Sequence, residues 1–236
     1  MSVKAKIVAG AATFTLVGGG LGMVGTLTAS AATPNCDTNG SSNCAQIFSQ
    51  KYGPQYLVDV FQAKSAAGTP VILFQASNSD PAEDFVPVDE GTVHNFYRHY
   101  GLVSAAFAKT YSADEAYEVQ YEPYGLNSNF CLSTWPGVAP QPGYKVRLEP
   151  CGKYSNTLWV ADAQNRVRDR HSAGGSDVPL INGATNSFSN PEVLNYPAGN
   201  PTDMPRPVLN VQPEKQYSNG TVFDNQEWGF KLGELG

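Results

Sequence analysis

Three similar segments follow one another along this chain, and their repetition limits the folds that the chain can adopt. Each segment begins with an apolar run, passes through a turn of small residues, Pro or Gly into a second apolar run, and closes on an aromatic residue. The first runs begin at Tyr56, Phe130 and Val193, and the closing aromatics are Phe85, Trp159 and Trp228. Because a unit of this length cannot bury its apolar face alone, the three copies predict one domain with pseudo-threefold symmetry.

The composition favours short strands joined by many turns. The chain has 23 Gly and 17 Pro, 11% of its residues are aromatic, and 15% are charged, against about 25% charged residues in an average soluble domain. This balance excludes a coiled coil, a helical bundle and a disordered acidic tail. Between the copies, the Ala-rich residues 103–111 and the capping-box spacing of Ser112 and Glu115 predict a short helix nearby.

The N-terminus has the order of a secretory signal. Lys4 and Lys6 precede an apolar stretch over residues 7–27, and small residues fill positions 28–32. A transmembrane anchor is the alternative, since about 20 apolar residues can span a bilayer, but the many Gly and Thr residues favour a cleaved signal. We therefore expect residues 1–32 to be a signal peptide, residues 33–54 an N-terminal appendage and residues 55–236 the repeat domain. The mature protein is expected to be secreted, extracellular and free of the membrane.

The cysteines fit an oxidising compartment. An even number of cysteines in an exported protein points to disulfides, and four cysteines can pair in three ways. We favour the local pairs, Cys36 with Cys44, which would staple the appendage, and Cys131 with Cys151. A zinc site is the competing interpretation, but the spacings match no CxxC pair and no His lies nearby.

Taken together, these segments resemble the ricin B-type β-trefoil, in which each of three units has a strand, a turn, a strand and a closing Gln-x-Trp motif. The resemblance spans most of residues 56–232. It is carried by Asn225-Gln226-Glu227-Trp228, by Cys131-Leu132 with Cys151, and by residues 59–71. The resemblance implies an all-β fold, a β-trefoil with long inter-repeat loops, preceded by the cleaved signal peptide. It also implies structural roles for Phe85, Trp159, Gln226 and Trp228, because the closing Trp fills the core and the Gln bonds unpaired backbone.

The resemblance further implies where a sugar would bind in each copy: an Asp after the first strand, an aromatic after the second and an Asn before the closing motif. The first copy keeps Asp59 and Phe74 but has Ala82 in the Asn position. The second copy keeps Asn156, with Ser133 and Glu149 at the other two positions. The third keeps Asn225, with Asn195 and Gln212 at the other two. The first copy is thus the most complete, although Asp59 and Asn225 could serve turns and Phe74 the core.

No catalytic motif is present in the sequence. His94, His99 and His171 lack the spacing of a zinc pair, so we expect His94 and His99 to be partly exposed loop residues, and we expect no cofactor or metal. A net charge of −6 without a basic run makes nucleic acid an unsuitable partner. The sequence predicts a secreted, non-catalytic lectin-like module for extracellular or cell-wall glycans. The alternative is a β-trefoil that binds protein, such as a protease inhibitor, without affinity for sugar.

Overall fold

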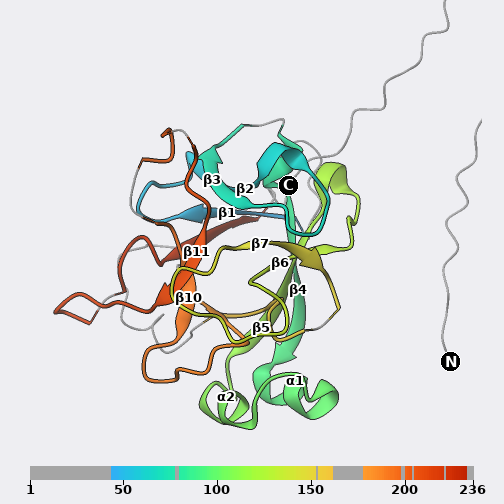
Figure 1. Cartoon of the computed structure of the whole chain (residues 1–236), viewed down its shortest axis with the longest axis vertical. Coiled ribbons are helices and arrows are strands. Elements are labelled where there is room, and N and C mark those ends of the chain that lie inside the picture. Colours follow the sequence, from blue (N-terminus) through green and yellow to red (C-terminus); the bar gives the residue numbers. More distant parts are fainter. Residues whose placement is uncertain are drawn as a thin grey trace, which may run out of the picture. The chain divides into compact units, whose positions relative to one another are not determined.

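The computed structural model describes residues 44–77, 80–152, 154–161, 178–197, 200–203, 205–220 and 222–232 (Figure 1). The predicted signal peptide, Cys36 and His171 lie outside the described residues. No helix among the described residues has the length and apolarity needed to cross a membrane.

The described residues form twelve strands, four in each copy. The first copy contains β1 (Ala45–Ser49), β2 (Tyr56–Val60), β3 (Val71–Gln75) and β4 (Phe85–Thr92). The second contains β5 (Glu115–Tyr121), β6 (Phe130–Ser133), β7 (Arg147–Pro150) and β8 (Leu158–Ala161). The third contains β9 (Leu180–Asn182), β10 (Glu192–Asn195), β11 (Asn210–Pro213) and β12 (Trp228–Leu232).

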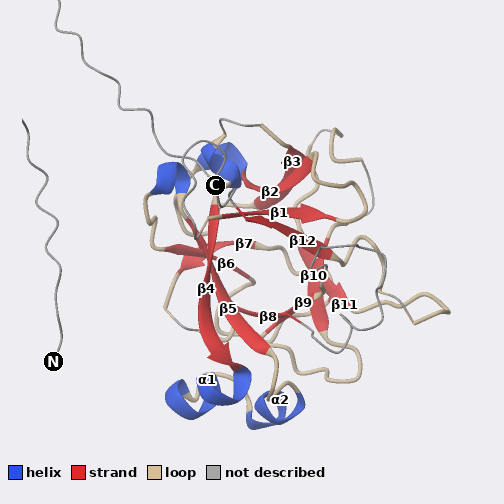
Figure 2. Ribbon diagram, turned by 180° about the vertical axis from the view of Figure 1, so that it is seen from behind, coloured by secondary structure: helices blue, strands red, loops and turns tan. Residues whose placement is uncertain are grey.

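The outer strands of the copies close into a barrel (Figure 2). Strand β1 pairs with β4 and with β12, β4 pairs with β5, β5 with β8, and β8 with β9. A bridge between Val178 and Trp228 then joins the start of the third copy to β12. Among the described strands this ring is closed, which protects the strand edges that would otherwise favour aggregation.

The inner strands form three hairpins, β2–β3, β6–β7 and β10–β11, that meet around one axis. Their backbones bond in a cycle, in which the amide of Val71 donates to Val146 (3.1 Å), that of Val146 to Leu209 (2.8 Å) and that of Leu209 to Val71 (2.8 Å). A barrel capped by three related hairpins is the β-trefoil, so the predicted fold is confirmed.

The closing aromatics fill the core at equivalent places. Phe85, Trp159 and Trp228 are fully buried in one hydrophobic cluster. The indole Nε1 of Trp159 donates to the carbonyl of Leu132 at 2.9 Å, and that of Trp228 donates to the carbonyl of Leu194 at the same distance. Phe85 has no such donor, so the first copy lacks this bond.

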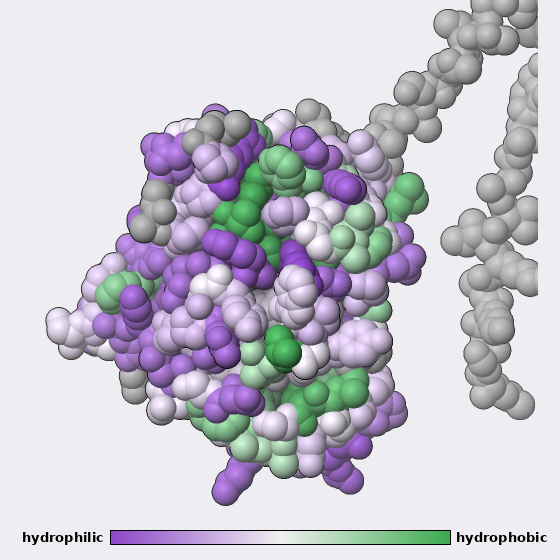
Figure 3. Space-filling model, viewed as in Figure 1, coloured by the Kyte–Doolittle hydropathy of each residue, from purple (hydrophilic) through white to green (hydrophobic). Residues whose placement is uncertain are grey.

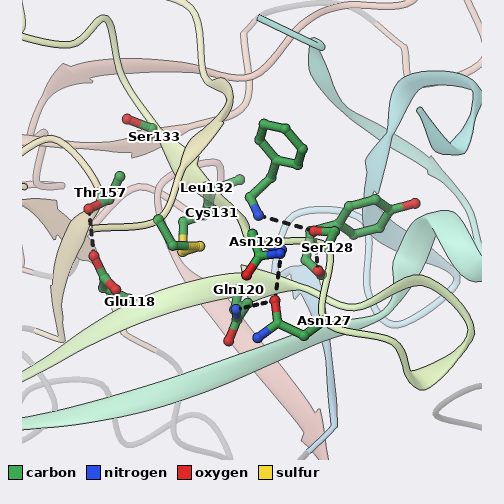
Figure 4. Close-up of a disulfide and its surroundings, with 12 residues drawn as sticks. Glu118, Gln120, Asn127, Ser128, Asn129, Cys131, Leu132, Ser133 and Thr157 are labelled. Carbon is green, nitrogen blue, oxygen red and sulfur yellow. Dashed lines mark hydrogen bonds between the residues drawn. A yellow bond between two sulfur atoms is a disulfide. The ribbon is translucent and has the colours of Figure 1, made fainter. Parts of the chain in front are cut away.

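The predicted disulfide between Cys131 and Cys151 is confirmed. It joins β6 to the residue after β7, close to the hydrogen bond from Thr157 to Glu118 (Figure 4). Cys44 is also disulfide-bonded, and its predicted partner Cys36 lies outside the described residues.

The N-terminal boundary and the helices differ in detail from the expectations. Strand β1 lies within the segment predicted as an appendage, yet it pairs with β12 over its whole length, so the barrel begins before residue 55. Helix α2 (Ala105–Thr110) lies where a helix was expected. Its N-terminal cap is Ser104 and not Ser112, because the hydroxyl of Ser104 accepts a hydrogen bond from the amide of Phe107. Helix α1 (Val93–Tyr100) places His94 and His99 on an exposed helical surface rather than in a loop.

Candidate functional site

A cavity of about 450 Å³ lies beside the hairpin of the first copy. Its walls include residues from β2, from β3 and from the segment after each, together with Pro205 and Arg206 from the third copy. The lining residues that bear on ligand binding are the charged Asp59, Asp80 and Arg206, the aromatic Phe61 and Phe74, and Ala82 at the predicted Asn position. The structure therefore brings the predicted pair Asp59 and Phe74 to one cavity. Figure 3 shows one face of the molecule, where apolar residues gather in small areas within a mostly polar surface.

Asp59 is the most deeply placed charge of this cavity. It lies on β2 opposite Ile72 of β3, and only 4% of its surface is exposed. Burial raises its pKa to about 7, the charge of Asp80 adds to this rise, and the charge of Arg206 opposes it. No hydrogen bond reaches the Asp59 carboxyl group from the residues that the structure describes, so its oxygens are available to a ligand in the cavity.

Two further carboxyl groups converge on Asp59. Asp80 caps the short 3-10 helix η2 (Pro81–Glu83), where it accepts a bond from the amide of Ala82 at 3.0 Å. Glu83 is fully buried and accepts a bond from the amide of Ser77 at 3.0 Å. One carboxylate oxygen from each of Asp59, Asp80 and Glu83 lies within 4.8 Å of the others.

Glu83 stands where the third copy has the closing glutamine. There, Gln226 accepts a bond from the amide of Lys215 at 2.7 Å and donates one to the carbonyl of Pro213 at 3.0 Å. The amide of Gln226 thus satisfies two backbone groups. A charged carboxylate has no donor for the second of these bonds, and Glu83 places another acidic group beside Asp59 and Asp80.

The aromatic wall of the cavity differs from the expected one. The guanidinium carbon of Arg206 lies 3.5 Å from the ring centroid of Phe74, so one face of this ring is already covered. The more accessible ring is that of Phe61, which is 41% exposed. Arg206 also brings up to five N–H donors to the cavity, in a planar arrangement that suits oxygen acceptors.

The segment that carries Phe61 has a strained backbone. It is the 3-10 helix η1 (Phe61–Ala63), in which Gln62 has a φ of 59° and Ala63 a φ of 51°. Left-handed conformations cost side-chain-bearing residues about 1 to 3 kcal/mol each and are often found at ligand-binding segments. Both residues line the cavity.

The asparagines predicted in the other copies make internal bonds. The side chain of Asn156 holds the loop after β6, because it donates to the carbonyls of Trp135 and Val138 and accepts from the amide of Gly137. In the third copy, Asn225 donates to Asn195 at 2.9 Å, and Asn195 donates to Asn210 at 2.7 Å. These side chains stabilise their loops, and neither set shares the cavity of Asp59.

Sequence reasoning missed three residues of the cavity. Phe61 follows Asp59 by two positions, so its place in the sequence could have indicated that it lies in the same site. Asp80 lies in a polar loop with no distinguishing pattern. Arg206 comes from the third copy, and the bridge between Ile72 of β3 and Val208 brings its segment beside the first copy.

No family model and no curated relative matches the sequence. Among solved structures, a designed threefold symmetric protein, ThreeFoil, is similar with a TM-score of 0.52 at 15% identity, over 80% of this chain and 97% of that one. A mosquitocidal holotoxin is similar with a TM-score of 0.51 at 14% identity, over 82% of this chain and 18% of the toxin. An exo-β-1,3-galactanase from Clostridium thermocellum has a TM-score of 0.51 at 10% identity, over 81% of this chain and 30% of that enzyme. At such identities the likeness shows the shared fold alone.

Proposed function

We propose that the protein is a non-catalytic carbohydrate-binding module and that it holds a sugar in the cavity of the first copy. One observation carries the proposal: the buried carboxyl group of Asp59, which receives no hydrogen bond from the described residues, lines the same cavity as the exposed ring of Phe61. A pyranose has an apolar face and a rim of hydroxyl groups, so a site for it needs an aromatic surface and a few directed polar groups. This cavity offers both.

Each wall has a distinct part in the proposed complex. Phe61 contacts the apolar face of the sugar, because Arg206 already covers one face of Phe74. Asp59 accepts hydrogen bonds from sugar hydroxyls, and Arg206 donates to ring or hydroxyl oxygens. Bonds that involve a charged group contribute about 1.5 to 3 kcal/mol each. Ala82 offers no side-chain bond where the ricin-type pattern has Asn, so we expect weak affinity for a single sugar.

Weak single-site affinity suits a repetitive ligand. A polysaccharide presents many equivalent sugars, and several protein molecules on one surface gain from their proximity. We therefore propose extracellular or cell-wall glycans as the ligand class. Secretion is part of this proposal, supported by the sequence of residues 1–32 and by the disulfide between Cys131 and Cys151. N-terminal sequencing of exported protein should begin near Ala32 or Thr33, and a start at Met1 or Ser2 would contradict it.

The test of binding uses the mature protein on a glycan array and on insoluble polysaccharides. We expect Phe61→Ala to weaken binding at least tenfold, since it removes the exposed aromatic surface. Trp135→Ala is the matched control, because Trp135 is 58% exposed but lies in the second copy outside the cavity. Melting curves show that each variant is folded before its binding is compared.

Three outcomes are informative. Loss of binding in Phe61→Ala with retention in Trp135→Ala supports the proposed site. Loss in Trp135→Ala alone moves the site to the second copy and contradicts the proposal. Absence of glycan binding in the wild type contradicts sugar recognition altogether and makes the protein-binding alternative the better hypothesis.

A further inference from the structure

We propose that Asp59, Asp80 and Glu83 form a binding site for one calcium ion at the inner wall of the cavity. Binding of the ion does not require that the cavity takes a sugar. A role for the ion in sugar binding rests on the proposed function.

The arrangement of the carboxyl groups fits one ion. Calcium takes six to eight oxygen ligands at about 2.3 to 2.6 Å, so two oxygens on the same ion are at most about 5 Å apart. The three carboxylate oxygens lie within 4.8 Å of one another. They come from β2, from the residue before η2 and from the end of η2, and backbone amides hold Asp80 and Glu83 in place.

The site holds more acidic groups than basic ones. Three carboxyl groups converge there, and Arg206 is the positive charge that acts on Asp59. Its guanidinium group is stacked on Phe74, and no ion pair joins Arg206 to Asp59 among the described residues. An isolated buried carboxylate is unfavourable unless a cation or hydrogen bonds compensate its charge. A divalent cation would supply that compensation.

Two buried polar groups without hydrogen-bond partners point to the same place. Asp59 is only 4% exposed, lines the cavity and receives no hydrogen bond from the described residues. The hydroxyl of Tyr121 is buried and also has no hydrogen-bond partner among the described residues. Tyr121 pairs with Phe85, which follows η2 by two residues, and their ring centroids are 5.6 Å apart, so its side chain lies beside the end of η2. Burial raises the pKa of Tyr121, and the charges of Asp59 and Asp80 raise it further. Water bound to the ion would provide the partner that Tyr121 lacks.

The ligand types select the ion. The cluster offers oxygen atoms only, whereas structural zinc sites use Cys and His. Magnesium requires near-ideal octahedral geometry at about 2.0 to 2.1 Å and releases its water reluctantly. A partly buried set of carboxylates on a strand and a short helix suits the larger and more adaptable calcium ion.

The experiment is a calorimetric titration of the chelator-treated mature protein with Ca²⁺. We expect one site, and we expect Asp80→Asn and Glu83→Gln each to weaken binding at least tenfold. Glu83→Gln keeps the shape of the side chain and restores the residue type that the third copy has at this position. The matched control is Asp89→Asn, since Asp89 is an exposed acid on β4 outside the cluster, and we expect it to bind like the wild type. If Ca²⁺ produces no binding heat, or if Asp80→Asn and Glu83→Gln bind Ca²⁺ like the wild type, the proposal is overturned.

A second measurement reports the location of the ion. Tb³⁺ replaces Ca²⁺ at oxygen sites and luminesces when a nearby tyrosine is excited. Tyr121→Phe should lower this luminescence at least threefold while it leaves the Ca²⁺ affinity within about threefold of the wild type. Unchanged luminescence in Tyr121→Phe would contradict this location.

The same proteins separate the two proposals. Ca²⁺ binding without glycan binding supports the ion site and contradicts the proposed function. Glycan binding by a protein that takes up no Ca²⁺ supports the function and overturns the ion site. If both occur and chelation lowers glycan affinity, the ion takes part in sugar binding.

Discussion

The carboxyl group of Asp59 is fully charged in water at neutral pH, but in the folded protein it is near half protonation. Burial raises its pKa from the ordinary 3.8 to about 7. Below pH 4 both the folded and the unfolded chain hold the proton, so Asp59 costs no stability there. Between pH 4 and pH 7 only the unfolded chain releases it, and the free energy of unfolding therefore falls as the pH rises.

This titration gives a prediction for Asp59→Asn in the presence of a chelator. The variant should melt at a higher temperature than the wild type at pH 8, because it removes a buried uncompensated charge and keeps the shape of the side chain. The difference should vanish near pH 4, where the wild-type carboxyl group is also neutral. Melting curves across this pH range measure both effects. A variant that melts below the wild type at pH 8 would show that Asp59 is well compensated in the metal-free protein.

The residues of the cavity also show how far sequence reasoning extends. Asp59 and Phe74 could be predicted because they lie on the strands of a recognisable repeat. The covering of Phe74 by Arg206 could not, since it depends on a segment more than 130 positions away. Glu83 stands at the position of the closing glutamine, but its proximity to Asp59 and Asp80 follows from the turn of η2 and not from spacing.

The strands and hairpins were predicted more reliably than the helices. The hairpins follow from paired apolar runs on either side of turn residues. Helix α1 was missed because Val, His, Asn, Phe and Tyr have only modest helix propensity, although Val93, Phe96, Tyr97 and Tyr100 recur at helical spacing. Strand β1 was included in the appendage because a polar segment with Cys36 and Cys44 precedes it. Its pairing with β12, the last strand, cannot be read from nearby sequence.

The disulfide of the second copy supports a prediction about one hairpin. Cys131 and Cys151 are 20 residues apart, and a loop of this length is stabilised by about 3 kcal/mol when closed. The double variant Cys131→Ser, Cys151→Ser should lose about this much in the free energy of unfolding, measured with urea. Its affinity for glycans should match that of the wild type, because the cavity lies in the first copy. A stability equal to that of the wild type would mean that the hairpin needs no covalent link.

The three copies are equivalent in the core and different at the surface. Trp159 and Trp228 make the same bond to the same position of the preceding hairpin, and Phe85 fills the third place. The surfaces of the copies have diverged, since the asparagines of the second and third copies make internal hydrogen bonds, whereas Asp59 of the first copy lines a cavity. The repeat therefore predicts the fold, whereas the site depends on residues that differ from copy to copy.

Substitution of Trp228 tests how strongly the barrel depends on its closing aromatics. Trp228→Ala should cost about 3 to 5 kcal/mol, the range for emptying a large aromatic site in a core. Trp228→Phe keeps most of the ring and loses the bond to Leu194, so it should cost clearly less than the Ala variant. Urea unfolding of both variants checks the order. Equal stability of Trp228→Ala and the wild type would show that the alignment of the three copies is incorrect.

Binding of a glycan in the cavity of the first copy can be observed directly. The most direct test is amide chemical-shift mapping by NMR of the mature wild-type protein, with a soluble oligosaccharide of the class that binds best on the array. We expect the largest changes at residues 59–63, 74–77, 80, 82–84, 206 and 208. Changes centred on Trp135 or on Asn225, with the first copy unaffected, would contradict it.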